Sequence, residues 1–211
     1  MVVKVHGTRS SRSPLVNWYL EEKKIPYEDA PPRPSAHPFG QVPFLVDGDV
    51  EVFESGAILL YLADKYDAAQ STAEDRAKYT QWVVWANSSL DPVCFVENDR
   101  GGVVDTRLDR PGRSVLILEK ILSERPWLVD DDFSVADVAV ASYLNYVPLF
   151  FPEVDLSASP NIAAYMEKCA TRDAFRAAFG QDHVDKVLGA TERAAEGPSS
   201  SGGNKKILGI F

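Results

Sequence analysis

The sequence predicts two domains of different class, a mixed α/β domain over residues 1–67 and an all-helical domain over residues 74–195. Up to residue 66, short β-branched or aromatic runs alternate with apolar-periodic segments, which is typical of strands mixed with helices. Beyond residue 73 the apolar residues recur at helical spacing almost throughout. A small, polar stretch at residues 67–72 suits a linker between the two.

The predicted elements of the first domain follow a recognisable order. They are a strand at residues 2–6, a helix at 14–24, a strand at 25–29, a proline-rich loop at 30–38, a strand pair at 44–46 and 50–53, and a helix that begins near residue 55 and ends at 66. This order predicts a mixed four-stranded sheet covered by helices, with parallel pairing first and an antiparallel hairpin second. It is the thioredoxin-like arrangement.

Composition limits the partners. The chain has 211 residues, enough for a substantial core, and a formal net charge of −9, which argues against nucleic acid and anionic membranes as partners. No apolar run approaches ~20 residues and no signal-peptide leader is seen, so we expect a cytoplasmic protein. Cys94 and Cys169 lie far apart and the three histidines lack ligand spacing, so we expect neither a disulfide framework nor a metal site.

The loop at residues 7–13 joins the first strand to the first helix. Ser13 stands before Pro14, and this pair suits an N-cap followed by a residue of the first helical turn. The loop therefore faces the positive end of a helix, where an anion is stabilised.

The stretch at residues 39–55 combines several binding features. Pro43 must occupy either the first position of a strand or a cis peptide bond in a tight turn, and either arrangement leaves the backbone of Val42 free to pair with an extended peptide. After the Asp-Gly hairpin, Ser55 is predicted to cap the next helix, whose end attracts a carboxylate, while Glu54 suits an ammonium group. Carboxylate and ammonium together describe the end of a small peptide.

These motifs resemble a known family. Gly40-Gln41-Val42-Pro43, the hairpin, and Glu54-Ser55-Gly56-Ala57-Ile58 are similar to the glutathione-binding half of the cytosolic glutathione transferases. The resemblance implies that Pro43 is cis, that the Val42 backbone pairs with the cysteinyl unit of glutathione, and that Glu54 and Ser55 hold its γ-glutamyl end. Gln41 belongs to the same predicted binding set, and glutathione would be a co-substrate, with no metal.

The same resemblance extends to the loop before the first helix. Its run Arg9-Ser10-Ser11-Arg12 is similar to the zeta-class Ser-Ser-Cys motif, with Arg12 in place of the cysteine, while the stretch from Pro38 to Pro43 has the phi-class form. The class therefore stays open, with a bacterial chi-like group as a further option. Ser10 takes the place of the activating serine, Ser11 is the alternative, and Arg12 adds a cation that would also stabilise a thiolate. Such help is needed because a free thiol, with a pKa of about 8.5, is mostly protonated at neutral pH.

The second domain is predicted as a helical bundle followed by a tail. The predicted helices lie at residues 73–98, 107–124, 135–147, 160–170, 173–179 and 182–195, and residues 196–211 have a linker-like composition with an apolar end. Ser134 and Asp137 form a capping box at the start of an almost wholly apolar helix, which we expect in the middle of the bundle. The family carries the same box, whose role we take to be structural.

The resulting hypothesis is a glutathione transferase that conjugates the thiolate to a small hydrophobic electrophile. The electrophile is expected between the domains, against the first helix of the helical domain. Trp82, Trp85, Ser89 and Leu90 share one side of that helix, although such stripes are more often core. Phe39 resembles the residue with which the family locks its homodimer, and the alternative is a residue that covers its own sheet. His37 and Arg33 lie in the proline-rich loop, where the resemblance allows a contact with the glycyl carboxylate of glutathione, but we interpret them as solvated loop residues. A glutathione-dependent isomerase and a non-catalytic binding or scaffold protein are the alternatives.

Overall fold

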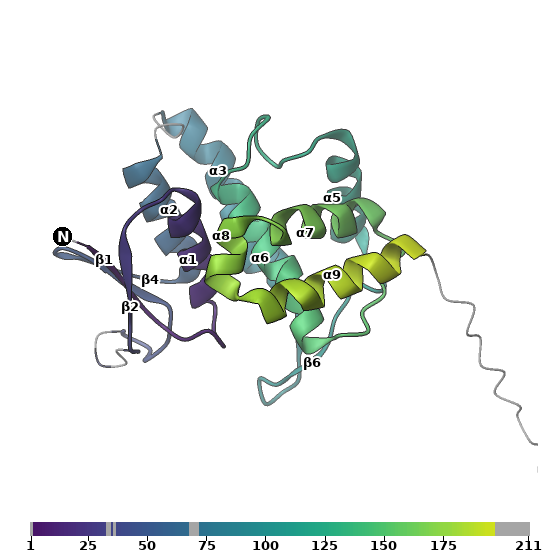
Figure 1. Cartoon of the computed structure of the whole chain (residues 1–211), viewed down its shortest axis with the longest axis horizontal. Coiled ribbons are helices and arrows are strands. Elements are labelled where there is room, and N and C mark those ends of the chain that lie inside the picture. The colour runs from purple at the N-terminus through teal and green to yellow at the C-terminus, as the bar shows by residue number, and fades with distance from the viewer. Residues whose placement is uncertain (1, 33–34, 36, 68–71, 197–211) are drawn as a thin grey trace, which may run out of the picture.

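The structure is a computed structural model that describes residues 2–32, 35, 37–67 and 72–196. Its first half is built on a mixed sheet with strand order β2-β1-β3-β4, in which β1 pairs parallel with β2 and antiparallel with β3. Two helices, α1 (Ser13–Glu22) and α2 (Ser55–Tyr66), lie between this sheet and the helices of the second half (Figure 1). The strands are β1 (Val3–His6), β2 (Tyr27–Ala30), β3 (Phe44–Asp47) and β4 (Val50–Phe53). The predicted thioredoxin-like arrangement is confirmed.

The β3–β4 hairpin forms as the Asp-Gly signal predicts. Gly48 has φ 67° in its turn, a conformation that glycine adopts without a steric penalty. Asp47, at the end of β3, then accepts hydrogen bonds from Tyr61, Lys65 and Tyr66, and so fixes the last turns of α2 to the sheet.

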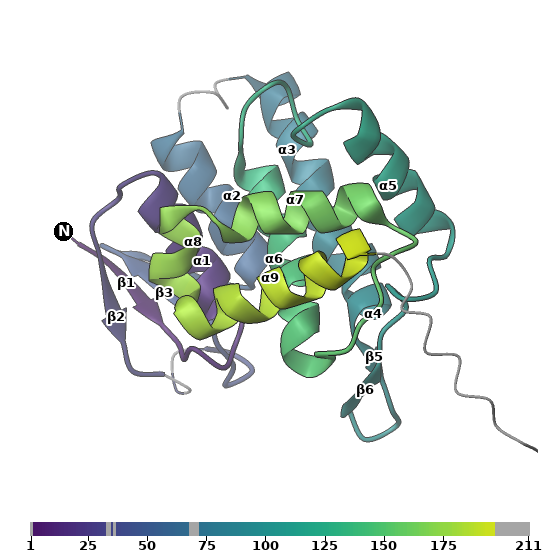
Figure 2. The same ribbon diagram turned by 45° about the vertical axis from the view of Figure 1, so that its right-hand side comes forward.

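The second half is helical, and α6 (Val135–Phe150) runs through its middle (Figure 2). The capping box at Ser134 and Asp137 is confirmed. The core is continuous across the two halves, because Trp18 of α1 packs against Phe175 and Phe179 of α8. The other helices of this half are α3 (Ala73–Trp85), α4 (Asp91–Cys94), α5 (Arg113–Glu124), α7 (Pro160–Ala170), α8 (Asp173–Phe179) and α9 (Gln181–Glu196).

The prediction of one long helix over residues 73–98 is wrong. α3 passes into a π-helical turn, η2 (Ala86–Leu90), and the short α4, and is followed by a hairpin of β5 (Val96–Glu97) and β6 (Val103–Asp105). Pro92 lacks the N–H that would continue the helical ladder. The Asn98 side chain accepts the N–H groups of Arg100 and Gly102 and so closes the hairpin turn.

Two further helix boundaries differ from the prediction. α5 begins at Arg113, directly after Pro111 and Gly112, instead of at residue 107. α6 continues through Pro148 to Phe150, where a loop was expected. Pro148 lies in the last turn, so it removes one hydrogen bond at a point where the helix ends anyway.

Among the residues that the structure describes, no helix has the length and apolar character needed to cross a membrane.

Candidate functional site

A pocket of about 450 Å³ opens where the N-terminal ends of α1 and α2 meet the turn before β3. Seven of the eight residues predicted for the site line it, and the exception is Ser10. His37 also lines the pocket. It is 4% exposed and its ring packs against Phe53, so the expectation that it is a solvated loop residue is wrong. The lining residues are Ser11, Arg12, His37, Gln41, Val42, Pro43, Glu54 and Ser55. Arg33 lies outside the described residues.

The turn before β3 has the conformation that the resemblance implied. The Val42–Pro43 peptide bond is cis. β3 begins at Phe44, so Val42 precedes the register with which β3 pairs to β1 and β4. The backbone of Val42 therefore lines the pocket without belonging to a strand ladder.

Neither helix at the pocket begins with the predicted serine cap. Ser13 and Ser55 both lie inside their helices, and the N-cap residues are Arg12 and Glu54, which make no side-chain capping bond. Glu54 has φ 67°, a strained conformation for a residue with a side chain, and residues held in this way concentrate at ligand sites. Both positive helix ends therefore face the pocket, because their N-cap residues line it.

The serine loop is held by its own backbone and by α6. The Ser11 hydroxyl donates to the Thr8 carbonyl at 2.7 Å and accepts from the Ser13 N–H at 3.1 Å. The Tyr146 hydroxyl donates to the Ser11 carbonyl at 2.9 Å. Ser10 is exposed, and its hydroxyl lies 3.3 Å from that of Thr8. The Ser11 hydroxyl also lies 2.8 Å from that of Ser13, so its hydrogen bonds stay within the loop and the start of α1. Among the described residues, the Ser10 hydroxyl has only the long contact with Thr8.

Arg12 connects the loop to the helical half. Its guanidinium forms an ion pair with Asp91 at 2.5 Å, donates to the Tyr143 hydroxyl at 3.2 Å, and lies 4.7 Å from the centre of the Tyr143 ring. Burial raises the pKa of Asp91, although the Arg12 charge acts in the opposite direction. Burial also raises the pKa of Tyr143 to about 12, so this hydroxyl is a neutral donor at physiological pH.

No sequence motif indicates the partners of Arg12. Asp91 and Tyr143 lie 79 and 131 positions further along the chain, and neither belongs to a motif. Only the packing of α4 and α6 against the loop brings them to the site.

A second pocket of about 580 Å³ adjoins the first and shares Ser11 and Arg12 with it. Ser10 lines this second pocket. Its wall is mostly apolar and partly aromatic, and polar side chains lie around it. The apolar residues are Phe95, Val103, Tyr146, Leu149, Phe150 and Phe179, and the polar ones are Arg9, Glu97, Asp182, His183 and Lys186.

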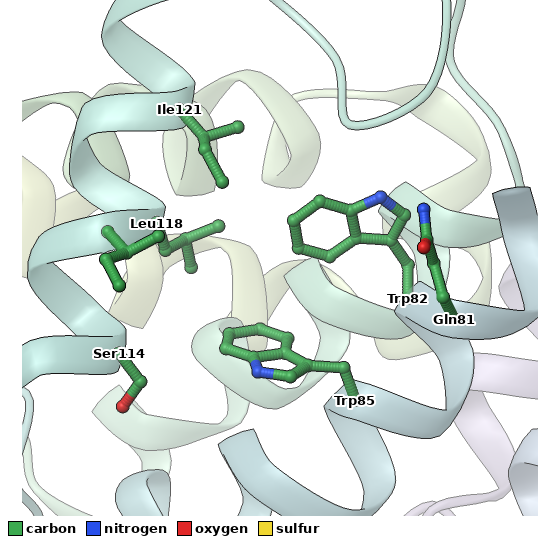
Figure 3. Close-up of a pocket in the computed structure, with 7 residues that line it drawn as sticks. Gln81, Trp82, Trp85, Ser114, Leu118 and Ile121 are labelled. Atoms are coloured by element: carbon green, nitrogen blue, oxygen red, sulfur yellow. The ribbon is translucent and has the colours of Figure 1, made fainter.

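Trp82 and Trp85, which share one side of the first helix of the helical half, do not line this second pocket. They border a different pocket of about 330 Å³ between α3 and α5, opposite Leu118 and Ile121 (Figure 3). Leu90 is buried in the core. The second pocket lies instead against the β5–β6 hairpin, the end of α6, and α9.

In the part of the chain that the structure describes, no group of three or more histidine, cysteine, aspartate or glutamate side chains is placed to hold a metal ion. Cys94 and Cys169 are both buried, and burial raises the pKa of each thiol.

Comparison with known proteins places this geometry in a family. The family model for the N-terminal domain of glutathione S-transferase matches residues 1–64, and the model for its C-terminal domain matches residues 90–173. Glutathione S-transferase F9 of Arabidopsis thaliana is 30% identical over 70% of this chain and 81% of its own length. Glutathione S-transferase 1 of Schizosaccharomyces pombe is 32% identical, and the match covers 65% of each chain. This chain therefore spans just under two thirds of the length of that relative.

Solved structures agree on the fold. A glutathione transferase family member from Pseudomonas fluorescens Pf-5, solved with two glutathione molecules bound, has a TM-score of 0.70 at 22% identity and covers 85% of this chain and 92% of that one. A glutathione S-transferase III in apo form has a TM-score of 0.66 at 26% identity, and the match covers 84% of this chain and 95% of that one. The family models, the relatives and the fold agree: this chain belongs to the glutathione S-transferase family.

Proposed function

We propose that the protein is a glutathione transferase that joins the glutathione thiolate to a small hydrophobic electrophile. One observation carries the proposal: the pocket at the ends of α1 and α2 and the apolar pocket beside it share Ser11 and Arg12. A sulfur atom placed at these two residues is within reach of both pockets. In the reaction the thiol loses its proton to solvent, the thiolate bonds to the electrophilic carbon, and the leaving group departs with its electron pair.

The first pocket supplies groups that match each part of glutathione. The free backbone of Val42, with Gln41 beside it, suits the extended cysteinyl unit. The first turn of α2 at Ser55 suits the γ-glutamyl carboxylate, and the Glu54 carboxylate suits the ammonium group on the same carbon. Several relatives of this fold have been solved with glutathione bound, which supports this assignment.

Ser10 is the proposed donor to the thiolate. The Ser11 hydroxyl is engaged by the Thr8 carbonyl and by Ser13. Among the described residues, the Ser10 hydroxyl has only a 3.3 Å contact, and Ser10 lines the pocket proposed for the electrophile. Arg12 contributes positive charge that Asp91 partly offsets. The positive end of α1 acts in the same direction, and together these groups favour the charged form of the thiol.

The electrophile pocket favours an apolar, aromatic substrate. Phe95 and Phe150 lie edge to face in its wall, with ring centroids 5.3 Å apart. Aromatic walls bind flat apolar rings through their faces and edges.

The test is turnover with defined electrophiles. The protein is incubated with glutathione and, separately, a chlorinated nitroaromatic, an isothiocyanate and an organic peroxide, and conjugate and free thiol are measured. We expect conjugation and an equal loss of glutathione with at least one. Rearrangement of a substrate with no net loss of glutathione would indicate the isomerase. Glutathione binding without turnover of any electrophile would indicate the non-catalytic binding protein.

We further propose that the protein is a homodimer in which Phe39 of each subunit enters the partner. Phe39 is 71% exposed, a costly position for a phenyl ring. The pocket in Figure 3 has the complementary character, with Trp82 and Trp85 edge to face and Leu118 opposite them. Light scattering after gel filtration tests this proposal: the wild type should have twice the subunit mass, and Phe39→Ser should shift towards monomer.

A further inference from the structure

Three polar side chains from three different elements meet behind the first turn of α2. The Asn87 Oδ1 accepts a hydrogen bond from the Tyr143 hydroxyl at 2.9 Å and from the Ser55 hydroxyl at 3.4 Å. The Asn87 Nδ2 donates to the Val83 carbonyl at 2.8 Å, and this bond turns the amide oxygen towards the two hydroxyls. Ser55 is 5% exposed and Tyr143 1%, so water competes little for these bonds.

Asn87 reaches Ser55 because the helix is locally widened. It lies in η2 (Ala86–Leu90), the π-helical turn between α3 and α4. Such turns are frequent at functional sites. Contact with α2 is close, since a Cβ atom at Gly56 would come within 2.7 Å of the Asn87 Nδ2. The glycine next to Ser55 thus lets the two elements approach each other.

We propose that Asn87 is a positioning residue for glutathione, which holds the Ser55 hydroxyl in the orientation that grips the γ-glutamyl end. Asn87 does not line the pocket, so it acts through Ser55. Its second partner, Tyr143, is also contacted by Arg12. One amide oxygen therefore connects the γ-glutamyl end of the pocket to its thiol end. This inference rests on the proposed function.

The experiment is a double-mutant cycle in the full-length protein with glutathione as the titrated ligand. Asn87→Leu has a similar shape but lacks both polar atoms. We expect it to raise the glutathione Kd and KM about fivefold, the cost of losing one hydrogen bond, because the Ser55–Asn87 bond is long at 3.4 Å. The kcat at saturating glutathione and the KM for the electrophile should stay within about twofold. Because Asn87 acts through Ser55, adding Asn87→Leu to Ser55→Ala should weaken glutathione binding by less than about twofold more.

Two further variants keep the test clear of folding effects. Ser88→Ala is the matched control, because Ser88 of η2 makes the same kind of bond to α3, at the Val84 carbonyl, but is exposed and does not line the pocket. It should bind glutathione like the wild type. Tyr143→Phe keeps the ring under Arg12 and removes only the hydroxyl, and it should also weaken glutathione binding if the Asn87 oxygen needs both partners. The melting temperature of each variant is measured alongside.

The outcomes separate the two proposals. If the wild type does not bind glutathione, the proposed function is wrong and the role of Asn87 falls with it. If the wild type binds and Ser55→Ala weakens binding, the proposed glutathione site stands, and turnover of the electrophile tests the proposed reaction separately. In that case the inference is overturned if Asn87→Leu binds glutathione with the wild-type Kd. It is also overturned if Asn87→Leu raises the glutathione Kd by the same factor in the Ser55→Ala background as in the wild type.

Discussion

The starts of α6 and α2 both carry a serine, and the two serines are used in opposite ways. At α6, the Asp137 carboxylate accepts from the Ser134 N–H and hydroxyl, from the Leu128 N–H, and from the Tyr165 hydroxyl, all within 3.0 Å. At α2, Ser55 lies inside the helix and Glu54 makes no side-chain capping bond. The first start is closed by the protein itself. The second is left open, and it lies at the proposed glutathione pocket.

A serine at a helix start therefore has two physical meanings. Where a carboxylate of the same chain occupies the positive helix end, the motif stabilises the fold. Where no such carboxylate is present, the end remains available to an anionic ligand. The predictions below test this difference, starting with the largest expected effect.

The closed start should matter for stability and not for binding. Asp137→Ala leaves several buried donors without an acceptor, and should lower the free energy of unfolding by about 3 kcal/mol. Glutathione affinity, measured on the folded protein at low temperature, should not change. A loss of affinity at unchanged stability would contradict the distinction between the two helix starts. Ser134→Ala, which removes one of the donors, is the control and should cost less.

The open start of α1 should matter for chemistry. Ser10→Ala should lower kcat/KM by about a hundredfold, the usual cost of removing one donor to a developing anion. Compared with Ser10→Ala, Ser11→Ala should lower kcat/KM less and lower the melting temperature more, because the Ser11 hydroxyl makes hydrogen bonds that hold the loop. The reverse ranking would show that Ser11 holds the thiolate.

The Arg12–Asp91 ion pair should set the pH at which the thiolate forms. Asp91→Asn keeps an acceptor for Arg12 but removes the charge that offsets it. The cation then stabilises the thiolate more strongly, so the pKa of the bound thiol falls. The acid limb of the kcat/KM profile should shift to lower pH by about half a unit. A shift to higher pH would mean that Arg12 needs the Asp91 charge to stay in place.

Asp47 does not line the pocket, and its carboxylate is held by hydrogen bonds from α2. Its substitution should have the smallest effect, on stability alone. Burial raises the pKa of Asp47, but hydrogen bonds from Lys65, Tyr61 and Tyr66 outweigh it, so the pKa is lowered overall. A lowered pKa stabilises the fold above the ordinary carboxyl range and loses this effect as the pH falls through the folded value. Asp47→Asn should therefore lower the melting temperature by about 3 °C at neutral pH and by less below about pH 4. An equal loss at both pH values would show that the charge of Asp47 is not involved.

The sequence predicted those features whose partners are close in the chain. Val42 and Pro43 before a hairpin, and Ser134 with Asp137, are local patterns that physical rules can interpret. The contacts of Arg12 with Asp91 and Tyr143, and of Ser55 with Asn87, depend on how the two halves pack, and no spacing encodes them.

The same limit explains the errors of boundary and pocket. Apolar residues around η2 fit one long helix as well as a helix followed by a hairpin, so the β5–β6 hairpin was missed, and with it one wall of the second pocket. The tail at 197–211 lies outside the described residues.

The most direct test of the open helix starts is to follow every backbone amide by nuclear magnetic resonance while glutathione is added. The account predicts that the largest shifts occur at Arg12 and Ser13 at the start of α1, at Val42, and at Ser55 and Gly56 at the start of α2, while Ser134 to Asp137 stay unchanged. Shifts concentrated elsewhere, with these amides unmoved, would contradict it.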